Sequence, residues 1–477
     1  MIDSLKNIWQ KNLAELAEKI FAEKSICKKN ICMANICEAD LPKSMLQSQG
    51  NLHDDLRSSL HSALFIHFTK LAKILVAILC VYIFGVCIFV SALSAKSSRS
   101  SLRLFIVGDA LIHKSVYEDA LGQKEQNYAN RAESLHYDFT KMLELIAPIS
   151  KKHDLAFYNQ ESILGGTHLG LSTYPRFNSP QEFGLNMLRL GFNLVSLANN
   201  HTLDRGEVGV RSMLDFWRKM EARNSTLYTT GSFESFKSRQ KIQHKILHKN
   251  DISYAMLAYT YGTNGIPLPQ GKEYLVNIYT KEMLRRDIEA IRAEVDLLIV
   301  SIHWGVEYTH TPTKEQREIA KFLASLGVDI VIGNHPHAIQ PIERIGNTLV
   351  FYALGNFISA QVGLQKRVGL IASVQIDKIQ NARKNASRIN HTTKPHPKRA
   401  QRKSKINNRI YKKIPKKIKL RNIRADLVYT YYKHEQKMSD FKVYPFSLLN
   451  DELLPNYQSI YKDYIKIIDK DWLIIGL

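Results

Sequence analysis

Short apolar runs alternate with longer amphipathic segments over most of the chain from residue 102 onward. Apolar runs of this length, separated by helical patterns, are typical of buried strands that are joined by crossover helices. The pattern therefore predicts an α/β fold. The strands are expected at Leu102–Val107, Leu155–Tyr158, Leu194–Leu197, Ile252–Tyr259, Leu297–Ile302, Ile330–Ile332, Leu349–Tyr352 and Leu370–Ile376.

Two of the intervening helices carry start and stop signals. The segment Ser179–Glu182 has the pattern of a capping box with proline at the first helical position, and Thr313 with Gln316 forms a second capping box. Gly191 and Gly327 are expected to end these helices. Each helix leads into a strand, through LGFNLVSLANNH and LGVDIVIGNHPH, so the order helix, glycine, strand, Asn-His occurs twice.

A separate apolar segment, Ile74–Leu93, contains twenty residues without a charge. At about 1.5 Å per residue a helix of this length crosses the roughly 30 Å hydrocarbon core of a bilayer. The run is longer than that of a cleaved signal peptide and begins late in the chain, which favours an uncleaved single-pass anchor. Basic residues flank the segment equally on both sides, so charge alone assigns no orientation: Arg57, Lys70 and Lys73 precede it, and Lys96, Arg99 and Arg103 follow it.

The net charge of +22 comes mostly from one part of the chain. Residues 383–424 contain 17 Lys and Arg and no acidic residue, so the remainder carries only +5. Few apolar residues and much like charge within 381–420 predict a solvated, disordered insertion in the domain. The alternative is a contact of residues 383–424 with lipid headgroups or an anionic polymer. Nucleic acid is disfavoured, because Tyr411 is the single aromatic residue available for stacking.

Polar clusters follow five of the expected strands. They lie at 108–109 with His113, at 159–161, at 199–201 with Asp204, at 303–305 with Glu307, and at 333–337. Ligands of open α/β sheets bind at the carboxyl ends of the strands, and carboxylate, amide and imidazole suit manganese, iron or zinc. A site for two metal ions is the sharper hypothesis. The alternatives are a helix cap at Asp109, turn residues at 199–200, a core histidine at position 303 and surface histidines at 335 and 337.

Six segments in order resemble the CapA family of poly-gamma-glutamate (capsule) biosynthesis proteins. They are VGDALIHKSVY, FYNQES with YPRFNSP, GFNLVSLANNHTLDRG, SIHWGVEYTHTPTKEQ, GVDIVIGNHPHAIQPIE and YALGNFIS, and together they cover about residues 102–380. The family's domain is similar to the metallophosphoesterase fold. The resemblance thus implies a sandwich of β-sheets flanked by helices, preceded here by one transmembrane helix.

The resemblance also implies roles for individual residues. Glu161 would be the carboxylate that bridges two divalent ions (Mn, Fe or Zn), and His201 and His113 would be catalytic. The other metal ligands would be Asp109, Asn200, His303, His335 and His337. Substrate binding is expected from Asp204, Arg205 and Trp304, for which packing or local turn hydrogen bonds are equal alternatives.

Two positions depart from the metallophosphoesterase pattern. His113 lies four residues after Asp109, where the pattern places an Asp-any-His triplet, and it either binds metal or contacts substrate. Glu161 stands where the pattern has Asp, which lengthens the bridging ligand by one methylene group. Occupancy by a single metal ion is the alternative to a dinuclear site.

The sequence predicts an N-terminal tail at 1–73, a transmembrane helix at 74–93, and a domain at 102–460, and the resemblance implies that the tail is cytoplasmic. The resemblance places that domain on the outer, periplasmic or extracellular, side of the membrane. The predicted function is metal-dependent hydrolysis or transfer in the biosynthesis of poly-gamma-glutamate or a related capsule or envelope polymer. The competing class is a non-enzymatic accessory subunit that binds anionic polymer beside polymer synthase or exporter subunits. A third reading is a stand-alone phosphatase for small phosphoesters.

Overall fold

The computed structural model describes residue 79 and residues 100–121, 137–379 and 417–477. The predicted tail at 1–73 lies outside these residues, as does the predicted membrane span at 74–93 apart from Leu79. Within the described ranges, none of the helices is both long and apolar enough to cross a membrane. The membrane anchor therefore stays a prediction.

The first sheet contains nine strands and is built around β1 (Ser101–Ala110). On one side of β1, three strands follow in parallel, β2 (Leu155–Gln160), β3 (Leu194–Ser196) and β4 (Tyr228–Thr230). On the other side the long strands are antiparallel, β12 (Val368–Lys378), β13 (Ile418–His434) and β14 (Met438–Pro445). Two short strands complete the sheet, β11 (Asn356–Ile358) beside β1 and β15 (Ile474–Ile475) beside β13.

The second sheet contains six strands in the order β5-β6-β7-β8-β10-β9. Its central strands β6 (Ile252–Thr260), β7 (Leu297–His303), β8 (Ile330–Asn334) and β10 (Thr348–Phe351) are parallel. Its edges are antiparallel, β5 (Leu247–Lys249) and β9 (Ile342–Ile345). The parallel strands of both sheets are buried on both faces, as expected where helices and a second sheet cover them.

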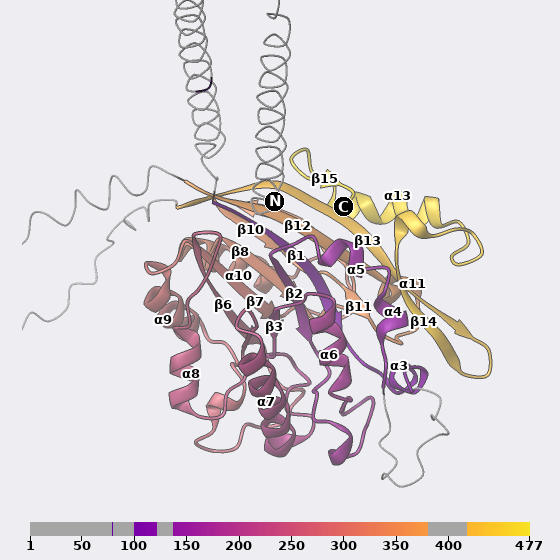
Figure 1. The fold of residues 1–477 in the computed structure, drawn as a ribbon, viewed down its shortest axis with the longest axis horizontal. Helices are drawn as coiled ribbons and strands as arrows, with labels where there is room; N and C mark the ends of the chain where they lie inside the picture. The colour runs from indigo at the N-terminus through magenta and orange to yellow at the C-terminus, as the bar shows by residue number, and fades with distance from the viewer. Residues whose placement is uncertain (1–78, 80–99, 122–136, 380–416) are drawn as a thin grey trace, which may run out of the picture. The chain divides into compact units, whose positions relative to one another are not determined.

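The two sheets pack face to face, with helices on their outer faces (Figure 1). Along β1, Leu104 and Ile106 point into the core between the sheets, whereas Phe105 and Val107 point toward the helices. The first sheet is covered by α4 (Thr140–Leu143), α6 (Glu182–Arg189) and α7 (Gly206–Arg223). The second is covered by α9 (Lys281–Arg292) and α10 (Lys314–Ser325). The arrangement is the predicted α/β sandwich of sheets flanked by helices.

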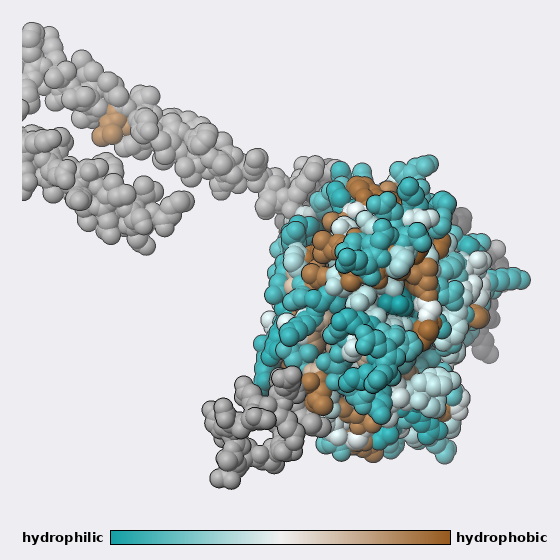
Figure 2. Space-filling view, turned by 90° about the vertical axis from the view of Figure 1, so that its right-hand side faces the viewer, coloured by the Kyte–Doolittle hydropathy of each residue, from teal (hydrophilic) through white to brown (hydrophobic). Residues whose placement is uncertain are grey.

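The remaining helices are mostly short and connect the layers. They are α3 (Lys114–Asp119), α5 (Ala147–Ser150), α8 (Phe236–Gln243), α11 (Leu364–Arg367) and α13 (Tyr457–Ile468). Figure 1 shows α13 beside β13, on the opposite side of the domain from α6 and α7. Figure 2 shows one face of the molecule, on which hydrophilic residues surround smaller hydrophobic areas.

All eight strands predicted from the apolar runs are present, whereas three other predictions need correction. The capping box at Ser179 is wrong, because α6 begins at Glu182 and the Ser179 hydroxyl donates instead to Ser162 Oγ at 3.0 Å. The predicted insertion at 381–420 ends too late, because β13 begins at Ile418; residues 381–416 lie outside the described ranges. The predicted domain end at 460 is too early, because α13 continues to Ile468 and packs against the core between the sheets.

Candidate metal centre

The predicted ligands from the first sheet stand at the carboxyl ends of β1, β2 and β3. Asp109 is the penultimate residue of β1, where the register with β2 shifts. Gly108 precedes it, and a Cβ atom there would lie 2.0 Å from Gly355 O, so only glycine allows this approach of the two backbones. Glu161 directly follows β2, and Asn200 lies in the turn after β3.

The histidines come from the second sheet. His303 is the last residue of β7, and His335 and His337 follow β8. His335 has φ 100° and His337 has φ 53°, a backbone region that residues other than glycine rarely adopt. This irregular turn directs both imidazoles toward the carboxylates of the first sheet.

The six predicted ligands form one buried cluster. Each is at most 3% exposed to solvent. Two groups within the cluster have donor atoms that all lie within 4.8 Å of one another, Asp109 with Glu161 and His337, and Glu161 with His303 and His335. Glu161 belongs to both groups, with Oε1 at 3.5 Å from His303 Nε2 and 3.6 Å from His337 Nε2. These buried groups could hold a metal ion, and the shared carboxylate matches the bridging position.

Unpaired polar atoms in the cluster also fit a metal ion. Both carboxylate oxygens of Glu161 and the Nδ1 atom of His335 are buried and form no hydrogen bond. Leaving such atoms buried without a partner costs about 1–3 kcal/mol each, and more for a charged group. A bound cation would supply the missing partner.

Burial dominates the electrostatics of the cluster. It raises the pKa of Asp109 to about 7, and burial together with the nearby Asp109 charge raises the pKa of Glu161 well above its usual value. Burial and the neighbouring imidazoles hold the pKa values of His303 and His337 well below normal. The histidines are thus neutral, which is the form that binds a metal, and a cation would stabilise the ionised carboxylates.

Amide side chains orient the ligands. Asn200 Oδ1 lies 2.8 Å from His303 Nε2, which places the amide oxygen beside the second group. Asn159 Nδ2 donates to Asp109 Oδ1 at 2.8 Å, and Asn356 Oδ1 lies 2.9 Å from His337 Nδ1. Hydrogen bonds of this kind fix the orientation of metal ligands.

The predicted catalytic histidine His201 lies beside this cluster and is 5% exposed. Its Nδ1 atom is 2.7 Å from Asp204 Oδ2, and its ring packs edge-on against Phe177 with centroids 4.7 Å apart. Asn264 Nδ2 approaches the same Nδ1 atom at 3.4 Å and Asn200 precedes His201 in the chain. The carboxylate fixes the ring, so Nε2 is the nitrogen left for proton transfer.

His113, the second predicted catalytic residue, lies outside both ligand groups. Its ring packs edge-on against Phe177, with centroids 5.1 Å apart, so Phe177 contacts both His113 and His201. Its Nδ1 atom lies 3.0 Å from Leu111 O. Burial lowers the pKa of His113 to about 4, so the ring is neutral near pH 7.

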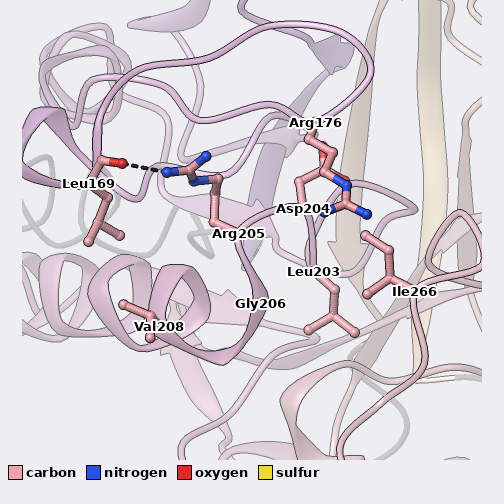
Figure 3. Close-up of a pocket in the computed structure, with 8 residues that line it drawn as sticks. All are labelled: Leu169, Arg176, Leu203, Asp204, Arg205, Gly206, Val208 and Ile266. Atoms are coloured by element: carbon pink, nitrogen blue, oxygen red, sulfur yellow. Dashed lines mark hydrogen bonds between the residues drawn. The ribbon is translucent and has the colours of Figure 1, made fainter.

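The three predicted substrate-binding residues divide between two environments. Asp204 and Arg205 line a pocket of about 410 Å³ (Figure 3). Trp304 is instead a core residue, 1% exposed, whose Nε1 donates to Tyr352 O at 2.9 Å. Packing, the alternative at this position, accounts for Trp304.

Several residues at the site were not predicted to take part in it. Phe177, Asn264 and Asn356 are examples, and Tyr261 packs against His335 with ring centroids 4.8 Å apart. The sequence pattern could have indicated Asn356, since this residue follows an apolar strand within YALGNFIS. No sequence pattern could have indicated Tyr261 and Asn264, because they lie in an irregular loop after β6.

Fold and site together define a two-sheet α/β protein with a buried cluster of carboxylates and imidazoles at its strand ends. Residues 103–361, which include every predicted site residue, match the sequence model of the bacterial capsule synthesis protein family PGA_cap. The chain belongs to this family, which confirms the resemblance predicted from its motifs.

Curated relatives agree with this assignment. The chain is 28% identical over 216 residues to the PGA biosynthesis protein CapA of Bacillus subtilis (strain 168), covering 44% of this chain and 53% of that protein. It is 28% identical over 175 residues to the capsule biosynthesis protein CapA of Bacillus anthracis, covering 36% and 41%. The chain thus spans about half the length of these relatives.

Two solved structures from Thermus thermophilus are also similar. A hypothetical protein has a TM-score of 0.35 and 14% identity, covering 58% of this chain and 93% of that chain. The protein TT1561 has a TM-score of 0.32 and 9% identity, covering 57% and 93%. Likeness at these TM-scores assigns no function.

Proposed function

We propose that the chain is a membrane-anchored, metal-dependent hydrolase or transferase that acts on poly-gamma-glutamate or a related capsule or envelope polymer. Membership of the capsule synthesis family supports the biological process. The observation that carries the proposed chemistry is Glu161, a fully buried carboxylate without hydrogen bonds that is shared by two ligand groups. Residues 74–93 would form the anchor, with the domain on the outer side of the membrane.

Each of the two ligand groups would bind one metal ion. Asp109, Glu161 and His337 would hold one divalent ion, and Glu161, His303 and His335 with the Asn200 oxygen would hold the other. Bound divalent ions supply Lewis-acid activation of water and of the substrate's oxygen atoms. Manganese, iron and zinc are the metals that suit this oxygen and nitrogen donor set.

The chain's own residues would handle the proton. Asp204 fixes His201 through Nδ1, so His201 donates a proton from Nε2 to the leaving group as the bond to it breaks. Phe177 packs edge-on against the ring and keeps it from turning. The same proton transfer serves hydrolysis of an amide or of a phosphoester.

Metal binding can be tested separately from activity. In the full-length wild-type protein, Mn²⁺ at 100 times its Kd is expected to stabilise the fold by about 2.7 kcal/mol, which raises the melting temperature. The Glu161→Gln variant, which lacks the bridging charge, is expected to lose this Mn²⁺-dependent rise. The His248→Ala variant, which alters an exposed histidine on β5, is the matched control and should retain it.

Turnover is tested by screening the Mn²⁺-loaded protein against poly-gamma-glutamate, peptidoglycan fragments and phosphoesters. His201→Ala and His303→Ala should abolish any activity that wild type shows, and His248→Ala should preserve it. Wild type that binds no metal, or activity that survives both substitutions, contradicts the enzymatic proposal. Polymer binding without turnover would instead support an accessory subunit of a synthase or exporter, and activity confined to small phosphoesters would support a phosphatase.

A further inference from the structure

The pocket beside His201 has a composition suited to an acidic chain. It has a volume of about 410 Å³ and lies where α7 begins, within the size range of small-ligand sites. Its lining combines two guanidinium groups, one carboxylate and several aliphatic side chains. The lining residues are Leu169, Arg176, Leu203, Asp204, Arg205, Gly206, Val208 and Ile266.

The two arginines are free to bind an anion. Among the described residues, no carboxylate forms an ion pair with Arg176 or Arg205. Arg205 Nη2 donates to Leu169 O at 2.5 Å, which fixes the guanidinium while leaving its other donors unused. Figure 3 shows the Arg205 guanidinium pointing toward Leu169, whereas Arg176 is drawn over Asp204 in this view. Guanidinium groups bind carboxylates through paired hydrogen bonds, so each could take one carboxylate.

Asp204 adds a second kind of contact. Its Oδ2 atom accepts a hydrogen bond from Phe177 N at 2.6 Å and lies 2.7 Å from His201 Nδ1. Its Oδ1 atom is buried and has no hydrogen-bond partner, although the residue lines the pocket. An unpaired acceptor in a residue that shares the pocket with two guanidinium groups suits a ligand that carries both carboxylates and N–H groups.

Side-chain contacts link the pocket to the metal centre. Asp204 contacts His201, and the preceding Asn200 lies 2.8 Å from His303. Phe177 follows Arg176 in the chain and packs against the His201 ring. A chain bound in the pocket would therefore lie next to the residues that hold His201.

We propose that this pocket is a subsite for an acidic polyamide chain next to the bond that reacts. Arg176 and Arg205 bind carboxylates, Asp204 Oδ1 accepts an amide N–H, and Leu203 with Ile266 contacts the methylene groups. The position of the reacting bond in this assignment rests on the proposed function. Binding of the acidic chain by the pocket residues does not depend on that function.

The test measures binding of labelled tri-gamma-glutamate to the full-length protein in the presence of Mn²⁺. The double variant Arg176→Ala, Arg205→Ala is expected to bind about tenfold or more weakly than wild type, because charged hydrogen bonds are lost. The control Arg218→Ala removes one positive charge from the exposed face of α7, where Arg218 pairs with Asp215, and should bind like wild type. Both pocket arginines are exposed, so the variants should fold normally.

Two further arms separate this inference from the proposed function. Asp109→Asn should lose turnover while binding tri-gamma-glutamate like wild type. The binding measurement can therefore be interpreted even when catalysis is absent. Glycerol phosphate oligomers of equal charge should bind more weakly than tri-gamma-glutamate. Equal binding by wild type and the double variant overturns the subsite, as does an equal loss in Arg218→Ala. Equal affinity for the phosphate oligomer overturns the assignment to carboxylates.

Discussion

The two Asn-His turns, at 200–201 and 334–335, use the same dipeptide in opposite ways. In the first, Asn200 Oδ1 lies beside the ligand His303, and His201 pairs with Asp204 outside the cluster. In the second, Asn334 Nδ2 donates back to Ser301 Oγ at 3.2 Å, and His335 enters the cluster. The dipeptide marks the strand end in both sheets, but the backbone of each turn decides which of its two side chains enters the buried cluster.

The largest effect is expected at the first turn. His201→Gln should lower kcat by about 10²- to 10⁴-fold, because general acid catalysis is lost, while the metal content stays that of wild type. Steady-state kinetics and metal analysis of the same preparation check both. Loss of metal from this variant would contradict the assigned role.

The histidine of the second turn should behave in the opposite way. His335→Ala is expected to weaken metal binding by about 100-fold or more, since losing even an outer partner of a ligand typically costs 10–100-fold. Titration of the metal-free protein with Mn²⁺ measures the affinity. Here His248→Ala is the control, and an unchanged affinity in His335→Ala would remove this residue from the ligand set.

The asparagine of the second turn should affect stability instead of metal binding. Asn334→Ala is expected to lower the free energy of unfolding by about 1–3 kcal/mol, because it leaves Ser301 Oγ and nearby buried groups without their partner. Denaturant unfolding of the variant, of Ser301→Ala and of the double variant measures the coupling. Purely additive losses would show that the bond between these two side chains contributes nothing.

The smallest effect concerns the helix that leads into the second turn. Thr313 caps α10 by accepting from Gln316 N at 3.1 Å, and Thr313→Ala should cost about 1 kcal/mol of stability. Thr311→Ala, at an exposed position two residues earlier, is the control and should cost less. Equal losses in thermal melts would mean that the cap is not the cause.

The sequence was most informative where a pattern depended on neighbouring residues. Apolar runs located the strands, and the polar residues after them located Asp109, Glu161 and His303, because strand ends of a parallel sheet share one edge. The capping box at Thr313 was correct for the same local reason.

Longer-range contacts account for the errors. Ser179 has the local pattern of a cap, but its hydroxyl is taken by Ser162, a residue seventeen positions earlier. Trp304 follows a predicted ligand and looked available for substrate, but its N–H donates to Tyr352 O, just after β10. No local sequence pattern predicts such partners. The backbone φ of 100° at His335 is equally unpredictable from the sequence.

The predicted ligands come from both sheets, which constrains the order of folding and metal binding. Asp109 is made early and His337 much later, and neither group of donor atoms exists until the second sheet has closed against the first. An extended chain in transit offers a cation no such site. A metal ion that binds this centre would therefore have to be loaded after folding, and it would come from the compartment in which the two sheets meet.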